Sequence, residues 1–159
     1  MLTRRNFVFS TAALAGFASP VMGACPVPEV GENQHAILML NAGCSDDGEP
    51  NVFEPAILRI ETGDSVTFVP TDSGHNSASK RGMIPEGAER WNGALNEELT
   101  VTFSVPGIYG HICLPHYEMG MVGLIIVGND LSNLKAVKKV RHPGSARKVF
   151  RSLLKEIAA

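Results

Sequence analysis

The feature that most constrains this chain is one short loop, Cys113-Leu114-Pro115-His116-Tyr117-Glu118-Met119-Gly120-Met121. It places a thiol, an imidazole and a thioether at Cys113, His116 and Met121, and a further histidine, His75, lies 38 residues before Cys113. One thiolate, two imidazoles and a weak axial thioether are the ligand set of a blue-copper electron-transfer site. The combination predicts that His75, Cys113, His116 and Met121 bind one copper ion.

Short apolar segments separated by turn residues run through most of the chain. We expect strands over residues 34–40, 56–61, 65–69, 99–105, 108–113 and 121–127. Two of these segments alternate apolar and polar residues with period two, and the even spacing predicts an antiparallel sandwich or barrel. Residues 70–98 break the pattern. A loop of that length in a compact domain is usually functional, and this one begins near His75.

Residues 130–159 differ in character and predict two short helices. Asp130 can cap the first, which would run to about Val140, and Pro143 can start the second. The second would carry its apolar side chains on one stripe, made of Val149, Phe150, Leu153, Leu154 and Ile157. We expect this stripe to dock on the chain's own domain. The alternative is a basic amphipathic helix that binds a membrane or a partner.

Charge is unevenly distributed along the chain. Residues 25–130 carry 15 acidic and four basic side chains, whereas residues 131–159 carry eight basic side chains and one acidic one. The main domain has no basic stripe, which argues against nucleic-acid binding.

The first 24 residues resemble an export signal. Thr3-Arg4-Arg5-Asn6-Phe7-Val8 is typical of a twin-arginine signal, and an apolar run follows it. The run is too short for a transmembrane anchor. We therefore expect residues 1–24 to be a signal peptide, residues 25–159 to form one domain, and the mature protein to be periplasmic and not inserted in a membrane.

Two cysteines are left once Cys113 is assigned to copper. Cys25 and Cys44 form an even pair, which in an oxidising compartment favours a disulfide. Two free buried thiols and a lipid attached to Cys25 are the alternatives.

Several segments together give the chain a close resemblance to the pseudoazurins, small blue-copper proteins of the cupredoxin family. They are Val52-Phe53-Glu54-Pro55, Gly63-Asp64-Ser65-Val66-Thr67-Phe68, Gly74-His75-Asn76, Met83-Ile84-Pro85-Glu86-Gly87-Ala88 and the run from Cys113 to Gly123.

The resemblance implies an eight-stranded Greek-key β-sandwich with the same four copper ligands near one end. The backbone N–H of Asn76 would bond the Cys113 sulfur, and the edge of His116 would be the electron port. Pro70, Pro115 and Met119 would form an apolar docking patch around that port. Met119 is also the rival axial ligand, because its spacing from Cys113 is that of amicyanin.

The family also implies a function, which is to carry single electrons in the periplasm, typically to a nitrite reductase, through transient complexes with redox proteins. We expect a monomer that is not an enzyme. The rival functions are a copper carrier or storage protein, and a copper oxidase or reductase. The latter needs a second copper site or an open coordination position. No spacing groups His35 and His142, the histidines left besides His111.

Three features depart from the family. Relatives carry a lysine ring around the apolar patch, but here Glu118 lies in the copper loop and several ring positions are uncharged (Ala42, Ser73, Asn92, Ala94 and Ile112). We therefore expect a partner with a basic or largely apolar face. The second departure is His111, which faces the core as Cys113 does; it is either a neutral histidine bonded to a backbone carbonyl or a group that tunes the copper potential. The third is the pair Cys25 and Cys44.

Overall fold

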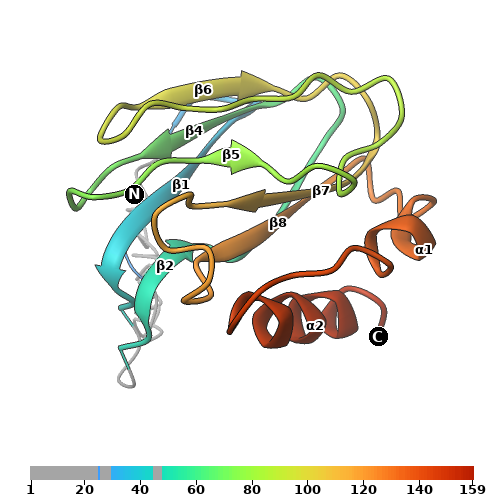
Figure 1. The fold of residues 1–159 in the computed structure, drawn as a ribbon. Coiled ribbons are helices and arrows are strands. Elements are labelled where there is room, and N and C mark those ends of the chain that lie inside the picture. Colours follow the sequence, from blue (N-terminus) through green and yellow to red (C-terminus); the bar gives the residue numbers. More distant parts are fainter. Residues whose placement is uncertain (1–24, 26–29, 45–47) are drawn as a thin grey trace, which may run out of the picture.

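The computed structural model describes residue 25, residues 30–44 and residues 48–159. Eight strands in this part of the chain form two four-stranded sheets (Figure 1). The first sheet has the order β2-β1-β4-β6 and the second the order β3-β8-β7-β5. The strands are β1 (Gln34–Ala42), β2 (Pro50–Glu54), β3 (Ile57–Ile60), β4 (Ser65–Val69), β5 (Ala78–Ser79), β6 (Leu99–Thr102), β7 (Gly107–Ile112) and β8 (Val122–Val127). Two helices follow, α1 (Leu134–Val137) and α2 (Ala146–Glu156).

The predicted β-sandwich with two C-terminal helices is confirmed, but the expected antiparallel pairing is found in only some of the strand pairs. β1 pairs with β4 in parallel, and β3 pairs with β8 in parallel. Parallel neighbours need a long connection rather than a hairpin turn. Local turn residues therefore carry no information about these two pairs. β2 and β5, both short, were also not predicted.

The main core lies between the two sheets. In β4 the alternation predicted from sequence is present, since Val66 and Phe68 are buried and the other three residues of the strand are partly exposed. Aromatic rings fill much of the space, and Trp91 packs against both Phe68 and Phe103. Cys113 and Met121 belong to the same cluster of buried side chains.

A second core lies on the outer side of the sheet that contains β7 and β8, where α1 and α2 cover it (Figure 1). Every residue of β7 and of β8 is buried, which is why Val122–Val127 reads as a continuous apolar run. The apolar stripe of α2 contributes Phe150, Leu153 and Leu154 to this core. The prediction that the stripe docks on the chain's own domain is confirmed.

Both helices are shorter than predicted. α1 has four residues and starts after Asn133, not Asp130. The Asn133 side chain accepts a hydrogen bond from the Ile108 backbone N–H and donates one to the Ile108 carbonyl, each at 2.9 Å, which fixes the helix start to β7. α2 starts after Ser145 rather than at Pro143. Residues 142–145 instead run along the loop of residues 113–121, called the ligand loop below, before the helix begins.

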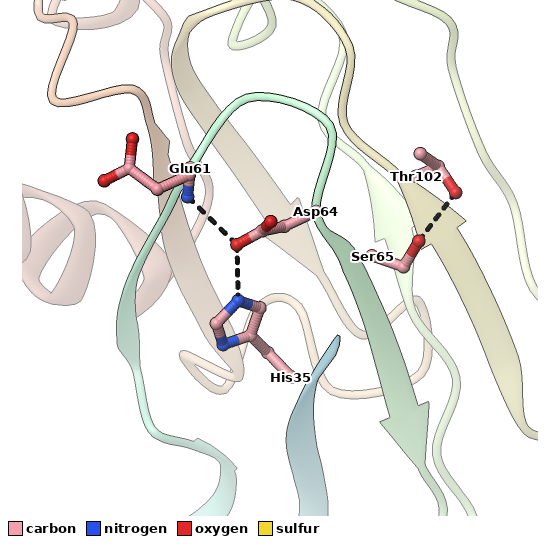
Figure 2. A network of polar contacts seen from close by, with 5 residues as sticks. All are labelled: His35, Glu61, Asp64, Ser65 and Thr102. Atoms are coloured by element: carbon pink, nitrogen blue, oxygen red, sulfur yellow. Dashed lines mark hydrogen bonds and ion pairs between the residues drawn. The ribbon is translucent and has the colours of Figure 1, made fainter. Parts of the chain in front are cut away.

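A polar network closes the end of the sandwich from which β4 begins (Figure 2). The Asp64 carboxylate lies 2.7 Å from His35 Nε2 and accepts a bond from the Glu61 backbone N–H. The hydrogen bond with His35 lowers the pKa of Asp64 below its usual value. The Ser65 and Thr102 hydroxyls bond across β4 and β6 at 2.7 Å. His35 therefore lies at the end of the sandwich where β4 begins, whereas the segment that carries His75 follows the other end of β4.

Cys25 and Cys44 form a disulfide, as predicted, with their Cα atoms 5.1 Å apart. Cys25 is buried against Leu38 and Leu40 of β1. The Glu54 carboxylate accepts a bond from the Cys44 backbone N–H at 3.2 Å. The bridge therefore ties residue 25 to the edge of the first sheet. Among the residues that the structure describes, no helix is long and apolar enough to cross a membrane.

We predict that replacing both Cys25 and Cys44 with serine lowers the free energy of unfolding by about 3 kcal/mol on the chain-entropy model. The reason is that the bridge joins residues 19 apart in sequence. Chemical denaturation monitored by fluorescence measures the change. The bridge itself is tested by thiol alkylation of the copper-free wild type without reductant. Three reactive thiols instead of one would contradict it.

Candidate metal centre

The ligand loop joins two antiparallel neighbours, since β7 ends at Ile112 and β8 begins at Val122. Its ends are closed by a bond from the Cys113 N–H to the Met121 carbonyl at 3.1 Å. Within the loop, the His116 carbonyl accepts bonds from the N–H groups of Met119 and Met121. The loop is therefore a compact hydrogen-bonded turn. His75 comes from elsewhere, on the segment between β4 and β5.

Three donor atoms converge at this end of the sandwich. Cys113 Sγ lies 3.8 Å from His75 Nδ1 and 3.6 Å from His116 Nδ1, and the two Nδ1 atoms are 3.2 Å apart. A point equidistant from these atoms lies about 2 Å from each, which is close to the bond lengths of transition metals to imidazole nitrogen and thiolate sulfur. The arrangement fits a metal ion, and a thiolate with two imidazoles is the trigonal part of a blue-copper set.

The orientation of His75 suits metal binding. Its Nε2 lies 2.9 Å from Asn41 Oδ1, an acceptor, so Nε2 carries the proton and Nδ1 keeps its lone pair. Burial lowers the pKa of His75, and the neighbouring His116 lowers it further. Both effects favour the neutral ring, which is the form that binds a metal.

The Cys113 sulfur is fully buried, and burial raises the pKa of its thiol. Bonds from the backbone N–H groups of Asn76 and His116 act in the opposite direction. The Asn76 side chain accepts a bond from the Leu114 N–H at 2.8 Å and donates one to the Gly93 carbonyl at 2.9 Å. Asn76 therefore joins the His75 segment to the ligand loop by both its backbone and its side chain.

The two candidate axial methionines differ sharply in exposure. Met121 is 0% exposed and packs in the main core beside Cys113, whereas Met119 is 57% exposed. Of the two methionines, only Met121 shares a buried cluster with Cys113.

The surface beside the site is apolar. Pro115 and Met119 are exposed and His116 is half-buried. Leu114, which we did not single out from the sequence, is 52% exposed and adds to this surface. Pro70 is half-buried directly after β4, and Glu118 is exposed in the loop.

His111 is buried as predicted, but the expected bond to a backbone carbonyl was wrong. Neither of its ring nitrogens has a hydrogen-bond partner among the described residues. The ring packs edge-on against Phe53 and Phe68, with centroids 4.5 Å and 5.2 Å away. The physical reason is that carbonyls of a sheet lie in its plane, whereas side chains stand perpendicular to it. Burial lowers the pKa of His111 to about 3, so the ring is neutral at ordinary pH. An effect on the copper potential stays a prediction.

Space for the His111 ring comes from its cross-strand neighbour. Gly123 is paired with His111 across β7 and β8. A Cβ atom at residue 123 would lie 2.5 Å from His111 Nε2, so only glycine fits opposite this histidine.

Residues 142–145, which lead into α2, contact the outer side of the ligand loop. The sequence did not indicate these contacts. The Tyr117 hydroxyl lies 2.7 Å from His142 Nδ1, and the Ser145 N–H donates to the Glu118 carbonyl at 2.8 Å. Gly144 permits this approach, since a Cβ there would collide with the Glu118 carbonyl. The Lys80 ammonium also lies over the Tyr117 ring, 5.0 Å from its centroid.

Among the described residues, one other group of potential metal ligands is found, namely Cys25, Cys44 and Glu54. The two cysteines are bonded to each other. His35 is hydrogen-bonded to Asp64 and His142 to Tyr117, so these two histidines do not form a second metal site together.

Comparison with known proteins agrees with this geometry. The family model for copper-binding proteins of the plastocyanin/azurin family matches residues 42–128. The pseudoazurin of Methylorubrum extorquens is 43% identical over 122 residues, which are 77% of this chain and 80% of that protein. The pseudoazurin of Paracoccus pantotrophus is 41% identical over 138 residues, 87% of each chain. A solved pseudoazurin structure from Sinorhizobium meliloti superposes with a TM-score of 0.75 at 47% identity, covering 79% of this chain and 97% of that one. This chain therefore belongs to the plastocyanin/azurin family of copper-binding proteins and, within it, to the pseudoazurins.

Proposed function

We propose that this pseudoazurin carries single electrons between larger redox proteins, with His75, Cys113, His116 and Met121 as its copper ligands. The convergence of three donor atoms within 3.8 Å of one another supports the ligand set. Thiolate and thioether suit Cu(I), and imidazole suits either oxidation state, so bound copper supplies a one-electron couple.

The burial of the donor residues is the observation that carries the electron-transfer role. His75, Cys113 and Met121 are each 0% exposed, and of the four only the half-buried His116 reaches the surface. A substrate would have to approach the metal directly, whereas an electron can pass through the exposed edge of the His116 ring. This favours a carrier over a copper oxidase or reductase.

The hydrogen bonds around the site also suit electron transfer. Asn41 orients His75, Asn76 joins the two ligand segments, and Ser145 holds the loop at Glu118. Ligands held in this way move little when the metal changes oxidation state, so little reorganisation is needed.

We further propose export by the twin-arginine route to the periplasm, with residues 25–159 as the mature domain. The signal, residues 1–24, lies outside the described residues. The Cys25–Cys44 disulfide supports an oxidising compartment. A route that exports folded proteins suits a chain that acquires its metal before or during export.

We propose that partners dock on the apolar surface formed by Leu114, Pro115 and Met119 around the His116 edge. A nitrite reductase fits the resemblance as one such partner. Of the ring positions that lack lysine, Ile112 is buried and so belongs to the core, whereas Ala42, Ser73, Asn92 and Ala94 are exposed. With Glu118 exposed in the loop, we propose a partner face that is largely apolar or basic.

Replacing Cys113 with serine should abolish the intense blue absorption of the Cu(II) protein, because a hydroxyl cannot supply the thiolate. The control is the double Cys25→Ser and Cys44→Ser variant, which should keep its colour. Optical titration with Cu(II) measures both. The wild type should bleach on one-electron reduction and recover on oxidation with its copper retained. Loss of copper on reduction would instead favour copper delivery.

Replacing Met121 with alanine should leave copper bound but shift the reduction potential, since the axial bond is weak and long. Met119→Ala removes the same atoms from an exposed position and serves as the matched control. Voltammetry and visible spectra of the two variants decide between them. A larger change in Met119→Ala would identify Met119 as the axial ligand.

Replacing Glu118 with glutamine should slow electron transfer to the physiological partner, because removing the negative charge weakens attraction to a basic face. Glu61→Gln is the matched control. Glu61 is exposed, and it follows β3, whose last residue pairs with Val127 at the end of β8 away from the ligand loop. Second-order rates measured against ionic strength test the effect, which should fade as salt screens the charges. Faster transfer by Glu118→Gln would point to an acidic partner face.

A further inference from the structure

A cavity of about 1000 Å³ lies between α1, the segment that follows it and α2, and it is separate from the donor residues of the metal centre. Its volume is at the upper end of the range found for small-molecule sites. Its apolar lining residues are Val137, Val140, Phe150, Leu154 and Ala158, of which Val137, Phe150 and Leu154 are buried.

Apart from His142 and Ala159, the rest of the lining is strongly basic. Six exposed cationic side chains line it, namely Lys138, Lys139, Arg141, Arg147, Arg151 and Lys155. No acidic side chain is among the lining residues. Within the described part of the chain, none of the six forms an ion pair, because the one salt bridge there joins His35 and Asp64.

These two features together define the chemistry of a ligand. Like charges gathered around one cavity repel each other, so an anion bound among them is stabilised. The apolar lining residues gain nothing from a hydrated inorganic anion, but burying an alkyl chain against them is favourable by about 25 cal/mol per Å² of apolar surface. We propose that the cavity between α1 and α2 binds a single-chain amphiphile with an anionic headgroup, such as a long-chain carboxylate.

His142 connects the cavity to the ligand loop. It lines the cavity, packs at a tilt against Phe150 with ring centroids 4.3 Å apart, and bonds to Tyr117, the neighbour of His116. A bound ligand should therefore change the NMR shifts of Tyr117 as well as those of the lining residues.

The test uses the copper-loaded, reduced protein, because Cu(I) is diamagnetic and permits NMR titration. Decanoate should bind saturably at one site, with shift changes at the lining residues and at Tyr117. Decanol, which has the tail alone, and acetate, which has the headgroup alone, should each bind at least tenfold more weakly. Equal binding of decanol and decanoate, or no saturable binding of decanoate, would overturn the proposal.

Two variants with the same charge change separate a site from general attraction. Lys139→Gln with Lys155→Gln removes two cations that line the cavity, and Lys135→Gln with Lys148→Gln removes two that do not. Decanoate affinity measured by calorimetry should fall at least tenfold in the first and less than threefold in the second. An equal loss in both, together with equally weakened binding to phosphatidylglycerol vesicles, would show a membrane-facing surface and overturn the proposal.

Discussion

The metal centre depends on the burial of β7 and β8 on both of their faces. The sheet-to-sheet core packs against one face, and α1 and α2 pack against the other. A strand pair enclosed in this way has a fixed register, because a slip of one residue would exchange its two apolar faces. The loop from Cys113 to Met121 begins and ends on this pair, so its geometry is set by the most buried part of the molecule.

The loop is held in place by protein contacts on each of its sides. The Cys113–Met121 backbone bond closes it, Asn76 fixes Leu114 from the His75 segment, and Ser145 binds the Glu118 carbonyl. These contacts hold the ligand loop and the His75 segment in one arrangement, in which the Cys113 sulfur and two imidazole nitrogens lie within 3.8 Å of one another. Such preorganisation is what a site needs if the same ligands must serve two oxidation states.

Sequence reasoning succeeded where function requires particular atoms at particular spacings. The fold class, the disulfide and the docking of α2 followed from residue patterns. The three converging donor residues, Cys113 and His116 in the loop and His75 before it, are among the four that the sequence predicted. Sequence reasoning failed for strand pairs and side-chain contacts between segments that are distant in sequence. The parallel pairs β1–β4 and β3–β8, the two-residue strand β5 and the contact between Tyr117 and His142 depend on tertiary packing. His111 was placed correctly in the core, but only the packed structure shows Phe53 and Phe68 where a carbonyl was expected.

The contacts of the C-terminal segment have a consequence for protein engineering. A loop of this kind is a natural candidate for transfer into another protein, because three of the four predicted copper ligands lie within residues 113–121. Here the loop contacts Gly144, Ser145 and the ring of His142. Transfer of the loop alone would leave these residues behind. A host that received residues 113–121 alone would lack this support on one side. The portable unit is instead the loop together with the segment that leads into α2.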